Sequence, residues 1–280
     1  EILKADQALR DAIGIERRGG EMLQPWYAKL HDRKIYGKLE VEFAFCIDEM
    51  PKADLYLAGE RPEKLHYSVN GHALAVPEVH DFWIDDCFKR MRLPCAYLKP
   101  GRNVVSYTVD FMRTTNLEAL YLIGDFGVRI EGHSRILTTL PDTIGNGNLD
   151  TYGLPFYTGE VTYLLTPEKY ADLDVTGAER VLLSPTAFTG ALVKVAAAGE
   201  ETQLLLWDPY TADVTEAVRA GKTIEVTVVG TRRNVFGPLH LVPAIHGAYG
   251  PGHFVTEGGA WSDDYVFVDS ALCGIKLRAM

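Results

Sequence analysis

Aromatic residues stand close to carboxylates at two places in the chain. Trp83 precedes Asp85 by two positions, and Trp207 is followed by Asp208 and, two residues later, by Tyr210. An aromatic ring can stack on the C–H face of a sugar while a carboxylate accepts hydrogen bonds from its hydroxyl groups, so these residues are candidates for binding carbohydrate. The simpler interpretation, that both tryptophans are core or edge residues of β-sheets, is the one we favour from sequence alone.

A second group of polar residues follows the last strong strand pattern of the second half. Arg232 and Asn234 stand shortly after the alternating run that ends at Val228. Polar residues on a loop can contact a ligand, and they can equally hold an interface between domains. We favour the interface and keep both residues as candidate carbohydrate contacts.

Known catalytic motifs are absent from the sequence. It contains no G-x-S-x-G, no P-loop and no H-E-x-x-H. Adjacent carboxylates occur at Asp85-Asp86, Glu200-Glu201 and Asp263-Asp264. Glycoside hydrolysis needs two carboxyl groups ~5–9.5 Å apart across a cleft, whereas neighbouring residues of a strand point to opposite faces. The sequence therefore predicts no catalytic residue.

Three histidines cluster late in the chain, at His240, His246 and His253. Their spacing matches no metal-ligand pattern, and no pair of the four cysteines has C-x-x-C spacing. We therefore expect no metal ligand and no cofactor. A structural calcium ion at the rim of a β-sandwich, held by aspartates and backbone carbonyls, is a weaker alternative.

The charge balance of the chain limits its partners. The 280 residues include 38 acidic and 28 basic ones, for a formal net charge of -10. Nucleic acids attract basic surfaces, so we expect no nucleic-acid partner. No apolar run approaches the ~20 residues that cross a bilayer, so we expect no membrane partner. The sequence opens at Glu1 rather than at a methionine, from which we expect a fragment of a longer protein, cytoplasmic or secreted.

One long helix is expected, at the N-terminus. Residues 2–15 place Ile2, Ala5, Leu9, Ala12 and Ile13 on one side at helical spacing, and Gly14 is a plausible stop.

The rest of the chain has the pattern of short β-strands, and that pattern is repeated. Residues 38–109 and 158–228 show the same order: strand-like runs, an aromatic segment around Trp83 or Trp207, and a last alternating strand. Turn signals such as Asn70-Gly71 and Ala220-Gly221 separate the runs. The prediction is an all-β protein with an N-terminal helix and linker (1–20), a first β-sandwich (21–140) and a second β-sandwich (141–280).

A glycine-rich segment interrupts the second half. Residues 246–260 contain too many glycines for regular structure, so we expect a long surface loop. Tyr249, Phe254 and Trp261 are the side chains that could anchor it, against the first sandwich or another domain.

Short motifs in both halves resemble a known domain type. Residues 154–163, Asp213-Val-Thr215 and Arg219-Ala-Gly221 resemble the opening strand and later turns of the jelly-roll, galactose-binding-like domains attached to glycoside hydrolases. In the first half, Ser68–Gly71 and Lys99–Asn103 resemble the V-N-G and K-x-G-x-N turns of the same domains. Residues 231–240 and 261–268 resemble the C-terminal ends of large bacterial glycosidases of the α-L-rhamnosidase-like and family 2-like kind.

The resemblance implies two tandem jelly-roll domains without catalytic residues of their own. It implies the C-terminal accessory region of a bacterial glycoside hydrolase, which supports the catalytic domain of the same polypeptide, binds carbohydrate, or does both. A stand-alone carbohydrate-binding protein and an independent jelly-roll hydrolase or lyase are the alternatives.

Overall fold

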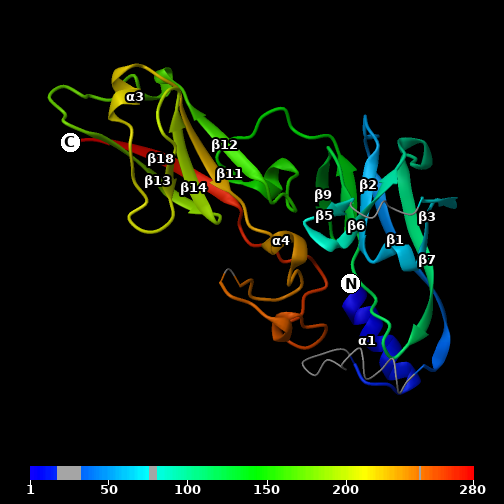
Figure 1. Ribbon diagram of the computed structural model, residues 1–280. Coiled ribbons are helices and arrows are strands. Elements are labelled where there is room, and N and C mark those ends of the chain that lie inside the picture. The colour runs from blue at the N-terminus through cyan, green and yellow to red at the C-terminus, as the bar shows by residue number, and fades with distance from the viewer. Residues whose placement is uncertain (18–32, 76–80, 246) are drawn as a thin grey trace. The chain divides into compact units, whose positions relative to one another are not determined.

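The protein is built of two compact units, each containing two β-sheets. The computed structural model describes residues 1–17, 33–75, 81–245 and 247–280, and Figure 1 shows four sheets and a short N-terminal helix. This confirms the all-β architecture. One unit comprises residues 1–140 and 240–265, and the other comprises 141–239 and 266–280. No helix among the described residues is long and apolar enough to cross a membrane. The first unit thus contains the segment 240–265 in addition to residues 1–140.

The first unit is a β-sandwich with sheets of six and four strands. The larger sheet has the order β4 (His72–Ala73), β3 (His66–Val69), β7 (Gly101–Met112), β1 (Ile35–Ile47), β10 (Ser134–Thr138) and β9 (Gly127–Glu131). The smaller sheet has the order β5 (Phe82–Trp83), β6 (Asp85–Leu93), β2 (Leu55–Glu60) and β8 (Tyr121–Ile123). Alternate residues of both sheets, including Val69, Val105, Leu57 and Leu93, are buried in one core, as expected of two sheets packed face to face.

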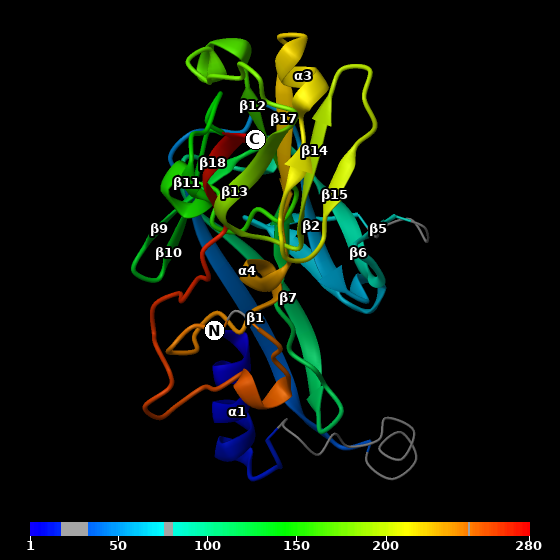
Figure 2. The ribbon, with the colours of Figure 1, turned by 90° about the vertical axis from the view of Figure 1, so that its left-hand side faces the viewer.

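The second unit is a smaller sandwich with two sheets of four strands. One sheet has the order β12 (Glu160–Leu165), β17 (Ile224–Val229), β14 (Leu192–Ala197) and β15 (Gln203–Leu205), which can be followed in Figure 2. The other has the order β11 (Gly147–Asn148), β18 (Ala271–Ala279), β13 (Val181–Thr189) and β16 (Ala212–Asp213). Both sheets contribute to one core, with Val193 and Val226 from the first and Leu183 and Leu272 from the second.

Short helices occur between the strands. The α-helices are α1 (Ile2–Ile13), α3 (Thr215–Arg219) and α4 (Arg233–Phe236). The 3-10 helices are η1 (Pro62–Lys64), η2 (Cys95–Tyr97), η3 (Leu149–Tyr152), η4 (Pro167–Tyr170) and η5 (Pro251–His253).

The two units share one strand order at their centres. In the first, β7 lies antiparallel between β1 and β3, and β2 lies antiparallel between β6 and β8. In the second, β17 lies antiparallel between β12 and β14, and β13 lies antiparallel between β16 and β18. The repeat seen in the sequence therefore corresponds to a repeated topology, and the tryptophan segments precede equivalent strands, β6 and β16.

Two asparagines from the turn motifs hold one end of the first sandwich together. Asn103 is fully buried, and its amide nitrogen donates to the carbonyl oxygens of Lys99 and Gly101 at 2.7 and 2.9 Å. Its amide oxygen accepts from the Lys99 N–H at 3.0 Å and from the Asn70 side chain at 2.8 Å. Asn70 also accepts from the Val104 N–H. The motif residues thus satisfy backbone groups where β3, β7 and η2 meet, which is a structural role.

In the second unit an ion pair occupies the comparable place. The turn after β14 contains Gly199, whose φ of 78° suits glycine. Next to it Glu200 pairs with Lys222, before β17, at 3.2 Å. The second half lacks the V-N-G motif, and in its place the ion pair of Glu200 and Lys222 links the same two turns.

Asn103→Ala should destabilise the protein by ~2–4 kcal/mol, because it leaves buried backbone groups without hydrogen bonds. The control is Asn116→Ala, at an exposed asparagine of the same unit, which should change stability by less than ~0.5 kcal/mol. Urea unfolding of the full chain measures both, and equal effects would contradict the structural role of Asn103.

Helix α1 has the predicted position and buries two charged residues. It ends at Gly14, which has a φ of 72°, as a helix-terminating glycine should. The buried residues are Asp6 and Arg10, whereas Ala5, Ala12 and Ile13 are exposed. The helix is therefore docked through a buried ion pair rather than through its apolar side.

Arg10 ties this helix to the chain that follows β7. Its side chain and that of Asp6 are 2% and 0% exposed, and Arg10 Nε donates to Asp6 Oδ2 at 2.8 Å. The remaining guanidinium nitrogens donate to the carbonyl oxygens of Arg113 and Thr115 at 3.2 and 2.6 Å. The guanidinium also lies over the Phe111 ring, 5.3 Å from its centroid. A buried charge needs such a full set of partners, since otherwise its desolvation is not compensated.

Arg10→Met should weaken the docking of α1 by ~3–5 kcal/mol, because it leaves the carboxylate of Asp6 buried without its cation. Arg17→Met is the matched control, since Arg17 pairs with Asp11 in an exposed position, where solvent screens the pair and its contribution is small. Amide hydrogen exchange of residues 2–13 measures the difference. Similar protection in both variants would show that the buried pair is not what holds the helix.

Candidate functional site

Trp83 and Asp85 lie on the β5–β6 hairpin of the first unit. The Trp83 ring is half-buried, 5.1 Å from the ring of Tyr121 and 6.4 Å from that of Phe88. Between Trp83 and Asp85, Ile84 has a φ of 65°, a conformation that is unfavourable for a β-branched residue. Trp83 therefore belongs to an aromatic cluster on an edge strand of its sheet, as the simpler interpretation of the sequence proposed.

The carboxylate of Asp85 is engaged locally. Its Oδ1 accepts a hydrogen bond from the Cys87 N–H at 2.9 Å, which lowers the pKa of this carboxyl group. Burial and the neighbouring Asp85 carboxylate raise the pKa of the Cys87 thiol to about 11. Asp85 thus stabilises the start of β6 and keeps Cys87 protonated.

Trp207, Asp208 and Tyr210 share the loop between β15 and β16 in the second unit. Trp207 is 73% exposed and Asp208 is exposed too. Tyr210 turns inward, where its ring meets Phe188 edge to face at 5.0 Å. The three residues are therefore brought together, but only the first two present their side chains to solvent.

Exposed leucines extend the apolar surface around Trp207. Leu204 and Leu206 are 54% and 44% exposed, while Leu205 between them is buried in the core. We call Leu204, Leu206, Trp207 and Asp208 the Trp207 surface. Leu204 lies on β15 and the other three follow it in the loop, and among the described strands β15 has a neighbour on one side only. Contiguous exposed apolar side chains of this kind usually mark a binding surface.

Arg232 and Asn234 differ in their environment. Arg232 is exposed at the start of α4. Asn234 is 6% exposed, and its amide pairs with the Val268 backbone in both directions, at 2.8 and 2.9 Å. Asn234 therefore connects α4 to the chain before β18, a structural role in this unit.

Strand directions place Arg232 at the same end of the sheet as Trp207. Both β15 and β17 run antiparallel to β14, so their C-terminal ends meet at one edge. The two strands are separated only by β14, and neighbouring strands lie ~4.8 Å apart, so the chains leave the sheet ~10 Å from each other. Trp207, Asp208 and Arg232 are thus the predicted residues that the structure gathers in exposed positions at one end of the unit.

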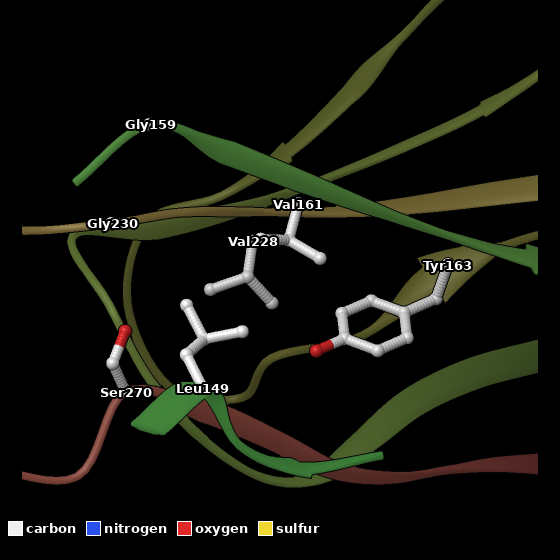
Figure 3. A pocket seen from close by; sticks show the side chains of 7 residues that line it. All are labelled: Leu149, Gly159, Val161, Tyr163, Val228, Gly230 and Ser270. Atoms are coloured by element: carbon white, nitrogen blue, oxygen red, sulfur yellow. The ribbon is translucent and has the colours of Figure 1, made fainter. Parts of the chain in front are cut away.

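A small hollow opens at this end of the second sandwich. Figure 3 shows that it is lined by Leu149, Gly159, Val161, Tyr163, Val228, Gly230 and Ser270. It encloses about 10 Å³, which is roughly the space of one water molecule. A Cβ at Gly230 would lie 2.9 Å from the Gly159 carbonyl oxygen, so glycine permits the close approach of the two chains there. The hollow is too small for a sugar ring, and a ligand at this end must bind on the surface.

A larger, charged hollow lies around the start of α3. It encloses about 300 Å³ and is lined by Glu179, Arg180, Glu200, Asp213, Thr215, Glu216 and Arg219. Arg180 pairs with Asp213 at 2.8 Å and Arg219 with Glu216 at 3.0 Å. Hydrogen bonds from Thr215 and the pair with Arg180 lower the pKa of the Asp213 carboxyl group. Its carboxylate therefore stays ionised and is a poor general acid.

The Asp213-Val-Thr215 motif is explained by this turn. Asp213 Oδ1 accepts from the Thr215 N–H at 3.0 Å, and the Thr215 hydroxyl accepts from the Val181 N–H at 2.8 Å. The motif fastens the start of α3 to β13. Like the asparagine motifs of the first unit, it stabilises the fold.

The late histidines do not converge in the part of the chain that the structure describes. His240 stacks on Trp261 at 4.6 Å, and His253 Nδ1 accepts from the Gly250 N–H at 2.9 Å. His246 lies outside the described residues. Among the described residues, no group of three or more His, Cys, Asp or Glu side chains could hold a metal ion.

Comparison with known proteins adds no family. No protein-family model matches this sequence, and no curated protein matches it. The function must therefore be argued from the side chains of the site itself.

The Trp207 surface contains two residues that the sequence did not single out. Leu204 and Leu206 alternate with a buried leucine, which is the signal of a half-buried strand. The pattern marks one side of this segment as buried, but it cannot show what the folded chain packs against the other side.

The Cys87 thiol should react slowly with iodoacetamide at pH 8, since a pKa of about 11 leaves ~0.1% of it as thiolate. It should react more slowly than Cys273, which is exposed. Asp85→Asn should raise the rate at Cys87, whereas Asp86→Asn, at an exposed residue paired with Lys89, should not. Mass spectrometry of the alkylated peptides gives both rates, and an unchanged rate in Asp85→Asn would contradict the electrostatic effect.

Proposed function

We propose that this chain is a non-catalytic accessory region of a glycoside hydrolase, and that its second unit binds carbohydrate at the Trp207 surface. The observation that supports this proposal is the 73% exposure of the Trp207 side chain beside the exposed Asp208. Holding a large apolar ring in water is unfavourable unless a ligand or partner covers it in use.

The chemistry of this surface suits a sugar. The indole of Trp207 offers a flat face for the axial C–H groups of a pyranose ring. The Asp208 carboxylate can accept hydrogen bonds from sugar hydroxyls, and the guanidinium of Arg232, which follows β17 at the same end of the sheet, can donate them. A hydroxyl both donates and accepts, so a carboxylate and a guanidinium together match a carbohydrate chain.

The fold assignment supports the same proposal. The shared strand order of the two units is compatible with a pair of jelly-roll, galactose-binding-like domains. We propose this domain type on the resemblance of the turn motifs, whose asparagines and threonine have structural roles.

The two tryptophan segments are expected to differ in function. Trp83 packs against Tyr121 and Phe88, while Trp207 is exposed on its loop. We therefore propose one carbohydrate site in this chain, in the second unit, although the tryptophans occupy equivalent places in the repeat.

Support of a catalytic domain is the second role, and the leucines of the Trp207 surface favour it. Leu204 and Leu206 are apolar and are 54% and 44% exposed. An apolar strip of this kind suits a protein surface better than a polysaccharide. Trp207→Ala distinguishes the two roles, because only a carbohydrate site gives a binding signal when sugar is added.

Trp207→Ala should weaken carbohydrate binding about 30-fold or more, because truncation of a central aromatic contact usually costs at least ~2 kcal/mol. Leu164→Ala is the control, since Leu164 is 52% exposed but lies on β12, at the other edge of the same sheet. A glycan array identifies a binding sugar, and calorimetric titration compares the variants.

Two results would contradict the proposal. One is a wild-type protein that binds no sugar on the array, which would leave only the supporting role. The other is equal affinity in Trp207→Ala and wild type, which would place the site elsewhere in the molecule.

A further inference from the structure

Five side chains of the first unit form a continuous column of rings and cations. In order they are Lys4, Trp261, His240, Tyr265 and Arg135. The Trp261 and His240 rings are stacked at 4.6 Å and 19°, and the His240 and Tyr265 rings lie 5.2 Å apart at 32°. Lys4 Nζ lies 4.5 Å from the Trp261 ring and Arg135 lies 5.8 Å from the Tyr265 ring. His240 is thus the middle member of the column.

The column joins three parts of the chain that are distant in sequence. Lys4 comes from α1 and Arg135 from β10, while the three rings belong to the segment 240–265. Asp263 reinforces the connection, because its Oδ1 accepts from Trp261 Nε1 at 2.9 Å and from Lys4 Nζ at 3.1 Å. A segment with little regular structure is therefore fastened to a helix and a strand through stacked side chains.

Hydrogen bonding fixes the neutral form of His240. Its Nδ1 lies 2.9 Å from the carbonyl oxygen of Ser262, which can only accept, so Nδ1 carries the proton in the neutral ring. The Ser262 N–H in turn donates to the His240 carbonyl oxygen at 2.9 Å. Protonation at Nε2 would place a charge between two rings whose outer faces already hold Lys4 and Arg135.

Charged groups surround His240 on every side. Helix α1 contributes Lys4 and its N-cap residue Glu1, the β9–β10 hairpin contributes Arg135 and His133, and the segment itself contributes Asp263 and Asp264. Burial lowers the pKa of the imidazole from its usual value. Hydrogen bonds with the Ser262 and Asp264 backbone and the charge of Glu1 act against this lowering without cancelling it.

We propose that the column is a pH-sensitive latch that holds the segment 240–265 on helix α1 and releases it when His240 is protonated. The inference is independent of carbohydrate binding, because it concerns the first unit. The attached segment disfavours the imidazolium, so the detached state binds more protons at mildly acidic pH. Attachment is therefore complete above the ordinary imidazole pKa of ~6.5 and weakens as the pH falls through it.

Amide hydrogen exchange of the full chain, corrected for the intrinsic rate at each pH, tests the latch. Peptides covering 247–265 should lose protection several-fold between about pH 8 and about pH 5, while peptides of β7 should not. His240→Phe keeps an aromatic ring in the column but cannot titrate, so its protection should not change with pH. His133→Gln should keep the wild-type pH dependence, because the neighbouring histidine is not the middle member.

Lys4→Met tests whether the Lys4 cation disfavours protonation of His240, and it leaves the histidine itself unchanged. Removing this cation should make the pH dependence of the segment smaller, whereas Lys169→Met in the second unit should leave it unchanged. Constant protection of residues 247–265 in the wild type from about pH 8 to about pH 5 would overturn the proposal. So would a pH dependence of wild-type size in both His240→Phe and Lys4→Met.

Discussion

The buried pair of Asp6 and Arg10 is the interaction on which the arrangement of the first unit depends. The apolar side of helix α1 is partly exposed. The helix is held instead by Arg10, which pairs with Asp6 and donates to carbonyl oxygens of the chain after β7. The docked helix then presents Lys4 and Gln7, and the chain that follows it presents Arg17, to residues 256–263 of the long segment. The position of the segment 240–265 therefore depends on the ion pair of Asp6 and Arg10.

The strands could be predicted from the sequence because their signal is local. Alternation of apolar and polar residues around Val41 and Val226 requires only one buried face, and the structure has it. The buried face of α1 could not be predicted, since Arg10 is buried by acceptors at Arg113 and Thr115, more than a hundred residues away. For the same reason the pattern could not show that residues 240–265 join the first unit.

The exposure of the candidate site residues could not be predicted from the sequence either. The two tryptophan segments have the same place in the repeat and precede equivalent strands, yet one ring is packed and the other is exposed. The difference comes from Tyr121 and Phe88, which other strands bring to Trp83. Sequence could name the residue types that suit a sugar, but exposure is set by neighbours that only the folded chain supplies.

Duplication explains why the recognisable motifs and the candidate site are separate. Asn70 with Asn103 and Asp213 with Thr215 are used up in hydrogen bonds that each unit needs to close its turns. A side chain engaged in these hydrogen bonds cannot also bind a ligand without loss of stability. Side chains free of them, such as Trp207 and Asp208, can diverge between the copies without affecting the fold. A repeated scaffold in which Trp83 is packed and Trp207 is exposed is therefore the arrangement expected when the turns are shared and the loop side chains differ between the copies.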